Sequence, residues 1–395
     1  MIKFMNYQFA DNVNDLKPSA IREILKSSSQ PGMIPFSAGN PAGEAFPAKE
    51  IAEISANLLA NDPVLALQYS VTEGYAPLRE QMRAYMREQY AVGTEDDEII
   101  MTAGAQQVMN LTAKVFANRG DAILCEDPSF IGSLNAFRSF GLNLVGVPVE
   151  ADGIDLHALE QAMQTHKNIR FLYVIPNFQN PSGITMSLAK RKAVYELAKQ
   201  YGVLILEDNP YGEIRFAGED IPSIKSLDTE GIVIYAGSFS KVLSPGMRLG
   251  YAIANKEIIS KMTVCKQTDD VHTSMWSQLI ADRFFREYDF GAHLDKIRAI
   301  YRRKANLCMK LADRYFSPAV EFFPVEGGLF LWCKLPAGTD MIDHCKRAFE
   351  KKVAVVPGTA FSVDPTAPSD RFRINYSTPT DEQIEQGIQL LGQLL

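Results

Sequence analysis

Apolar and polar residues alternate with two different periods between residues 48 and 254. Short apolar runs rich in branched and aromatic residues indicate buried strands at 99–102, 122–125, 142–147, 170–175, 203–207, 232–235 and 249–254. Apolar residues spaced every three or four positions indicate helices at 48–61, 76–90, 105–117, 129–140, 156–165 and 188–201. Strands that alternate with helices in this way predict a mostly parallel, doubly wound sheet with right-handed crossovers. The seventh run follows the sixth too closely for a helical crossover, so we expect it to be antiparallel to its neighbours.

The pattern changes character after residue 254. Helical periodicity continues through residue 286 and again over 292–315, and this second helix is long enough to link two domains. Short strand-like runs at 320–323, 328–335, 353–356 and 371–376 then mix with helical patterns at 340–351 and 381–395, as in an α+β unit. We therefore expect a large α/β domain at 48–290 with a seven-stranded sheet, and a smaller α+β domain built from 1–47 and 291–395.

The first 45 residues contain few periodic segments. A helix is expected from about Ser19, which is a suitable N-cap residue. The proline- and glycine-rich segment 35–47 is expected to form a rigid loop. Such a loop can approach a ligand closely, and a plain surface linker is the alternative.

Composition limits the classes of function. A chain of 395 residues with 46% hydrophobic and 22% charged residues is typical of a globular protein, and its length favours two domains. The net charge of −7 argues against a nucleic-acid partner, and no run of eighteen apolar residues predicts a membrane span. The N-terminus lacks the apolar stretch of a signal peptide. Five widely spaced cysteines suit free thiols in the cytoplasm, and the five histidines form no metal-ligand pattern.

Lys241 stands on a tight turn between two apolar runs, an unusual place for a lysine. A desolvated lysine loses its proton readily and can form a Schiff base. A lysine whose stem lies on apolar surface with its amine in water is the alternative, and taken alone it is the commoner case. The residues that follow the other strands decide between these two interpretations.

Chemically useful groups follow five of the predicted strands at the edge where open α/β sheets bind ligands. The first strand leads into Gly104, Ala105 and Gln106 at the start of a helix, whose free N–H groups attract an anion. Phe130, Asn180, Asp208 with Tyr211, and Ser238 with Lys241 follow later strands. Each has an ordinary explanation as a turn or cap residue, but all five groups at one edge are unlikely to coincide by chance. Together they suit an aromatic aldehyde cofactor with a phosphate and a ring nitrogen.

These motifs resemble those of the fold-type I pyridoxal 5'-phosphate (PLP) enzymes in the class I and II aminotransferase family. The resemblance extends from Gly39–Asn40–Pro41 to Arg373 and includes Ser238-Phe-Ser-Lys241, Pro-Gly-Met-Arg248, Asn180-Pro-Ser-Gly183 and Asp208–Tyr211. It implies Lys241 as the Schiff-base lysine, Asp208 as the partner of the ring nitrogen, and Asn180 and Tyr211 as ligands of the ring oxygen. It also implies a phosphate site formed by Gly104, Ala105, Gln106, Ser238, Ser240 and Arg248, with Phe130 stacked on the ring.

The resemblance further implies that Gly39, Asn180 and Arg373 bind the substrate, with Arg373 on its α-carboxylate. Tyr69 is similar to a tyrosine that reaches the phosphate of a neighbouring subunit, which implies a homodimer with shared active sites. The implied reaction is ping-pong transfer of an amino group between an L-amino acid and a 2-oxo acid, with 2-oxoglutarate as the expected acceptor. The seven-residue spacing from Lys241 to Arg248 resembles the branch with 2-aminoadipate and kynurenine aminotransferases and the effector domains of MocR-type regulators.

Two other functions stay open at this point. A PLP-dependent β-lyase could use the same fold, although Arg373 disfavours decarboxylation. A non-catalytic effector module of the MocR type is less expected, because the sequence starts directly with the aminotransferase-like part and is acidic. Arg22 could recognise an acidic substrate side chain or could simply be a solvated helix residue, so the amino donor is not identified.

Overall fold

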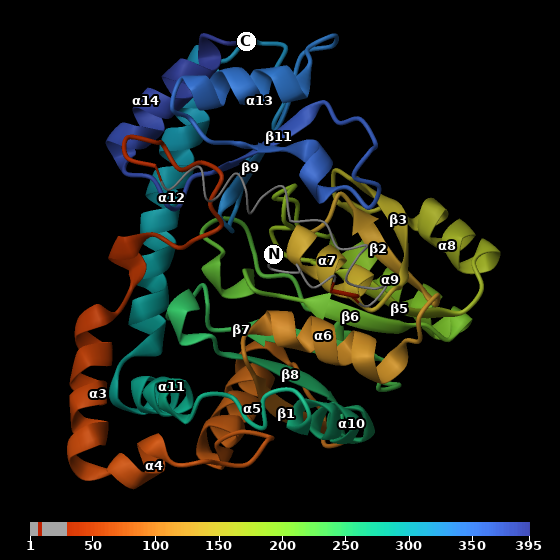
Figure 1. The fold of residues 1–395 in the computed structure, drawn as a ribbon, viewed down its shortest axis with the longest axis vertical. Coiled ribbons are helices and arrows are strands. Elements are labelled where there is room, and N and C mark those ends of the chain that lie inside the picture. The colour runs from red at the N-terminus through yellow and green to blue at the C-terminus, as the bar shows by residue number, and fades with distance from the viewer. Residues whose placement is uncertain (1–6, 10–29) are drawn as a thin grey trace, which may run out of the picture.

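The computed structural model describes residues 7–9 and 30–395 (Figure 1). The helix expected from about Ser19, and Arg22 within it, lie outside the described residues. The remaining elements form two sheets with helices packed around them.

The larger sheet has eight strands in the order β1-β8-β7-β6-β5-β2-β3-β4. They are β1 Asp97–Thr102, β2 Ala122–Asp127, β3 Asn143–Glu150, β4 Gly153–Ile154, β5 Ile169–Val174, β6 Leu204–Asp208, β7 Val233–Ser238 and β8 Gly250–Asn255. From β3 through β2, β5 and β6 to β7, adjacent strands are parallel, whereas β8 is antiparallel to both β7 and β1. The predicted mostly parallel sheet and its antiparallel last run are confirmed. The predicted number of seven strands is wrong by one, because the two-residue β4 is too short to show a hydrophobic period.

Alternating side chains of the parallel strands pack on opposite faces of the larger sheet. Helices α8 (Leu156–Thr165) and α9 (Leu188–Tyr201) cover one face and pack on residues such as Leu124 and Leu172. Helix α7 (Ile131–Ser139) packs on the other face, where Phe137 contacts Phe171 and Tyr173 edge to face. The other helices around this sheet are α3 Ala48–Asn61, α4 Pro63–Leu67, α5 Ala76–Tyr90, α6 Ala105–Phe116, α10 Lys256–Gln267 and α11 Met275–Glu287. Short 3-10 helices occur at Gly43–Ala45, Gly212–Ile214, Lys225–Leu227, Pro245–Met247 and Gly358–Phe361.

The second sheet is antiparallel, with three strands in the order β10-β11-β9. These are β9 Phe330–Lys334, β10 Val356–Pro357 and β11 Arg371–Asn375, and the accompanying helices are α12 Phe290–Tyr315, α13 Met341–Glu350 and α14 Asp381–Gly392. The strand predicted at 320–323 is wrong: only Glu321 pairs, in an isolated bridge with Lys334, and Pro324 has no N–H to extend the ladder.

Helix α12 runs along one side of the molecule from α11 toward the small sheet (Figure 1). The segment before α3 reaches the same region, since Ile34 exchanges backbone hydrogen bonds with Lys352 and Ala354. The exact domain boundaries at 47/48 and 290/291 stay a prediction. The cavity described next lies between the carboxyl edge of the large sheet and the small sheet.

Candidate active site

One cavity of about 320 Å³ collects nearly all the residues predicted from the sequence. Its lining includes Gly39, Ala105, Gln106, Phe130, Asn180, Asp208, Tyr211, Ser238, Ser240, Lys241, Arg248 and Arg373. Gly104 lies directly beneath Arg248, whereas Tyr69 is 83% exposed, lies outside the lining and packs against His272. The lining also includes Ser37, Ile131, Ser133 and Phe330, which the sequence reasoning did not name. Ile131 and Ser133 lie in α7 just beyond Phe130, whereas Ser37 and Phe330 follow no strand of the large sheet.

Lys241 follows β7 and points into this cavity. Its Nζ donates a hydrogen bond to the Gly39 carbonyl oxygen at 2.8 Å and lies 5.9 Å from the centre of the Tyr211 ring. Desolvation, and then the positive charges of Arg373 and Arg248, lower the pKa of Lys241 to about 8. The amine is therefore neutral far more often near physiological pH than an ordinary lysine, as a nucleophile or general base requires.

Asp208 is the last residue of β6 and is buried on the floor of the cavity. Its Oδ2 accepts a hydrogen bond from the Tyr173 hydroxyl at 2.8 Å, while Oδ1 is buried with no hydrogen-bond partner among the described residues. Burial raises the pKa of Asp208 to about 7, and the bond from Tyr173 opposes this rise. An unpaired buried carboxylate oxygen is costly, so Oδ1 is suited to a hydrogen-bond donor on a ligand.

Another part of the cavity lining is suited to an anion. Gly104 has φ +75° and precedes α6, so the free N–H groups of Ala105 and Gln106 open toward the cavity lining. A Cβ at Gly104 would lie 2.6 Å from Arg248 Nη2, which shows how closely the guanidinium crosses this turn. The Ser238 and Ser240 side chains line the same cavity. Helix N–H groups, hydroxyls and an arginine together are suitable ligands for a phosphate.

Arg373 enters from β11 of the small sheet and is buried. Its Nη1 donates to Asn180 Oδ1 at 2.7 Å and its Nη2 to the Ser37 carbonyl oxygen at 2.9 Å. The guanidinium carbon lies 4.1 Å from the centre of the Phe330 ring and 4.8 Å from that of Phe361. Burial lowers the pKa of Arg373 to about 10, so the side chain is still a cation at neutral pH. A fixed cation in this position can bind a carboxylate.

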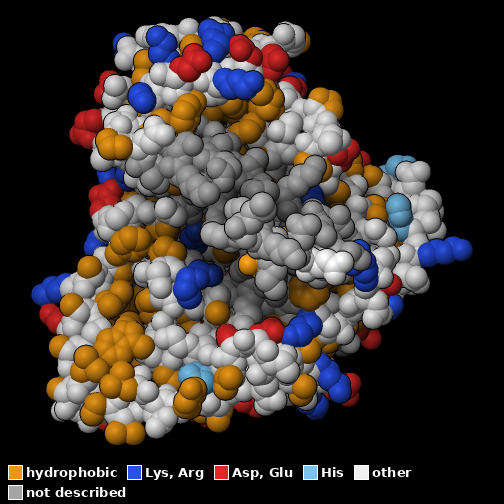
Figure 2. Space-filling model, viewed as in Figure 1, with side chains coloured by type: hydrophobic (Ala, Val, Ile, Leu, Met, Phe, Trp, Pro, Cys, Tyr) orange, Lys and Arg blue, Asp and Glu red, His pale blue; other side chains and the backbone are white. Residues whose placement is uncertain are grey.

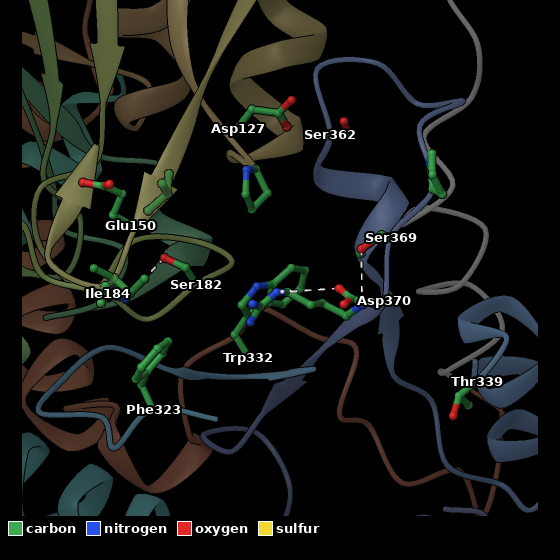
Figure 3. Close-up of a pocket in the computed structure, with 16 residues that line it drawn as sticks. Asp127, Glu150, Ser182, Ile184, Phe323, Trp332, Thr339, Ser362, Ser369 and Asp370 are labelled. Atoms are coloured by element: carbon green, nitrogen blue, oxygen red, sulfur yellow. Dashed lines mark hydrogen bonds and ion pairs between the residues drawn. The ribbon is translucent and has the colours of Figure 1, made fainter. Parts of the chain in front are cut away.

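A larger cavity of about 710 Å³ lies beside this site, between the ends of β2 and β3 and the small sheet (Figure 3). Asp127 and Glu150 line it from one side and Trp332 and Asp370 from the other. Trp332 packs with Phe361 and Ile131 in an apolar cluster that lies between the two cavities. Among the described residues, the lining of the larger cavity includes no lysine, histidine or cysteine, whereas the smaller one contains Lys241, so the chemistry is assigned to the smaller one.

Comparison with known proteins agrees with this assignment. The sequence model of the family described as aminotransferase class I and II matches residues 31–391. The chain belongs to this family. It is 37% identical to an aromatic-amino-acid aminotransferase of Thermococcus litoralis, over 98% of this chain and 94% of that protein. It is 38% identical to a 2-aminoadipate transaminase of Thermus thermophilus, over 98% of this chain and 96% of the relative.

Solved structures extend the agreement to the fold of this aminotransferase. The crystal structure of Pyrococcus horikoshii kynurenine aminotransferase, in complex with the amino form of the cofactor, superposes with a TM-score of 0.94 at 33% identity, covering 98% of this chain and 96% of that one. The prediction of a PLP-dependent aminotransferase of fold type I is confirmed. Among residues 7–9 and 30–395, no helix is long and apolar enough to cross a membrane.

The residues present in the cavity fit PLP. Asp208 Oδ1 lacks a partner where a protonated ring nitrogen would supply one, and the anion site at Gly104 and Arg248 suits the phosphate. The Lys241 amine belongs to the same cavity lining. These three features, taken from three different strand ends, give the cavity one ionic or nucleophilic partner for each functional part of the cofactor.

Proposed function

We propose that this aminotransferase moves the amino group of an L-amino acid to 2-oxoglutarate by a ping-pong mechanism. The observation that carries the proposal is the shared cavity of Lys241, Asp208 and Arg373, which brings together an amine of lowered pKa, a buried carboxyl group and a buried cation. When bound, PLP supplies an electron sink for the electron pair left on the substrate's α-carbon.

Each of the main residues that line the cavity has a proposed role in this reaction. The Lys241 amine would take the proton from the substrate's α-carbon and then, as an ammonium, would give it back to complete the transfer. Asp208 keeps the ring nitrogen protonated, and Tyr211 and Asn180 bind the ring oxygen. Arg373 holds the substrate carboxylate through the N–H groups of its guanidinium, whose Nη1 also donates to Asn180 and whose Nε has no partner among the described residues.

The phosphate and the ring face have their own proposed ligands. Gly104, the N–H groups of Ala105 and Gln106, the hydroxyls of Ser238 and Ser240, and Arg248 bind the phosphate, Phe130 stacks on the ring, and Gly39 approaches the substrate. The Phe130 ring lies across Gly132, where a Cβ would come within 2.5 Å of it. Gly132 therefore supports the position of the proposed stacking residue.

A single-turnover assay tests the proposal. Purified enzyme mixed with an amino donor and no acceptor should release one 2-oxo acid per active site, and added 2-oxoglutarate should then restore the starting absorbance. Lys241→Ala should abolish both steps, whereas Lys199→Ala, a change at a surface lysine paired with Glu230, should not. Transamination at the wild-type rate by Lys241→Ala would refute the assignment. Continuous release of pyruvate and ammonia without an acceptor would instead favour a β-lyase.

The amino donor is best sought among the substrate classes named in the relatives. Aromatic amino acids and 2-aminoadipate are the first donors to test, because full-length relatives carry those names at 37% and 38% identity. Ranking kcat/KM across aromatic, acidic and branched donors would identify the preferred class. We also propose a cytoplasmic location, supported by the five free cysteines Cys125, Cys265, Cys308, Cys333 and Cys345.

We further propose a homodimer in which Tyr69 completes the phosphate site of the partner. Tyr69 lies between the exposed residues Leu67 and Val71, outside the cavity of its own chain. Figure 2 shows hydrophobic side chains gathered over α3 and α4, where Leu59 and Val64 are also exposed. Such a surface is typical of an interface between subunits. Sedimentation should give twice the chain mass, and a fully active monomer would contradict the proposal.

A further inference from the structure

Tyr173 touches the cofactor partner Asp208 but is not part of any motif identified in the sequence. It lies in β5, fully buried, and its hydroxyl donates to Asp208 Oδ2 at 2.8 Å. This bond occupies one carboxylate oxygen and leaves the other, Oδ1, buried without a partner among the described residues while Asp208 lines the cavity.

The strand register explains why the two side chains meet. In the parallel pair of β5 and β6, Tyr173 is opposite Leu206, and Asp208 is two residues further along β6. Residues two apart on a strand share a face, so Asp208 is the diagonal neighbour of Tyr173 at a distance that an aromatic side chain can span. The edge-to-face contact with Phe137, at 5.4 Å between ring centres, holds the Tyr173 ring in place.

We propose that Tyr173 is a positioning residue for the cofactor. By binding Oδ2, its hydroxyl fixes the rotation of the Asp208 carboxylate so that Oδ1 faces the ring nitrogen, and as a donor it favours the charged form of Asp208. A phenylalanine in its place would keep the ring packing but free the carboxylate to rotate and to take up a proton. This inference rests on the proposed role of Asp208 as the partner of the ring nitrogen.

The test compares PLP with an analogue that has a carbon atom in place of the ring nitrogen. The apoprotein is titrated with each compound, and binding is followed by tryptophan fluorescence. Tyr173→Phe should weaken the binding of PLP about tenfold, which is the usual effect of losing a hydrogen bond to a charged group. It should leave the affinity for the analogue unchanged. Adding Tyr173→Phe to Asp208→Asn should weaken PLP no further, because the two residues act through one contact.

Tyr195→Phe is the matched control. Tyr195 is also buried, and its hydroxyl lies 3.4 Å from the carboxylate of Asp228, in a region away from the cavity. Its loss should lower thermal stability without changing the ratio of the two affinities. The positioning role would be overturned if Tyr173→Phe weakened the binding of both compounds equally, or the binding of neither.

The same titrations separate this inference from the proposed function. If Asp208→Asn does not distinguish PLP from the analogue, the role of Asp208 itself fails. If Asp208→Asn distinguishes them and Tyr173→Phe does not, only the role of Tyr173 fails. As a second measurement, the loss of PLP affinity on acidification should begin at higher pH in Tyr173→Phe, because Asp208 would then protonate more easily; an unchanged pH profile would also overturn the inference.

Discussion

Substituting Gly104 by alanine tests the phosphate site most directly. Gly104 has φ +75° and ψ 169°, a backbone conformation almost restricted to glycine. An added Cβ would lie 2.6 Å from Arg248 Nη2 and 3.1 Å from its Cζ. The methyl group therefore strains the turn before α6 and pushes the guanidinium away from the phosphate site.

The two effects have different magnitudes and different readouts. The strained backbone should cost about 1–3 kcal/mol of folding stability in the apoprotein as well as in the holoenzyme. Displacing Arg248 removes a charge-assisted hydrogen bond to the phosphate, worth about 1.5–3 kcal/mol. That loss corresponds to a PLP dissociation constant raised about ten- to a hundredfold.

The assay compares PLP with pyridoxal, which lacks the phosphate. Gly104→Ala should weaken the binding of PLP and leave the binding of pyridoxal nearly unchanged, so the ratio of PLP affinity to pyridoxal affinity should fall by that same factor. Gly120→Ala is the matched control: Gly120 also has a positive φ, of +87°, but an added Cβ there has no atom within 4 Å. The reasoning would be refuted if Gly104→Ala kept the wild-type ratio, or if Gly120→Ala lowered it to the same extent.

Three further substitutions test other parts of the structure. Arg373→Lys, which loses the forked guanidinium, should raise the KM of amino donors about tenfold or more while the PLP affinity is unchanged; equal KM values would contradict a carboxylate role. His344 is buried with neither ring nitrogen hydrogen-bonded among the described residues, and desolvation followed by Arg347 lowers its pKa to about 4. Because the unfolded chain takes up this proton below pH 6.5 and the folded chain does so only near pH 4, wild-type stability should fall by about 1.4 kcal/mol per pH unit between these values. His344→Leu should remove that slope, as measured by urea denaturation. If the stability of the variant depended on pH in the same way as that of the wild type, this prediction would be refuted. Lys225→Met should destabilise the fold by about 3–5 kcal/mol by leaving the buried carboxylates of Asp97 and Asp228 without their cation, at 2.7 and 2.9 Å; a loss below 1 kcal/mol in urea denaturation would contradict this.

The order of strands and helices could be predicted from the sequence because hydrophobic periodicity and turn-forming residues depend only on neighbouring positions in the chain. The predicted bounds of α8 and α9 agree with the structure to the residue, since a strong 3.6-residue period lies between clear capping residues such as Asp155 and Ser187. The strand β4 and the failed strand at 320–323 could not be predicted in this way. Two residues show no period, and an apolar run forms a strand only where a partner edge is available.

The sequence by itself determined which groups the carboxyl ends of the strands present, and therefore the family and the cofactor. Lys241, Asp208 and Asn180 each follow an apolar run, and the topology of a parallel sheet brings such positions together. Only the tertiary structure decided which side chains contact them. Tyr173 reaches Asp208 through the register of two strands separated by a helix, and Phe330 and Phe361 flank Arg373 from the small sheet. These contacts join residues far apart in the chain, so no local pattern records them.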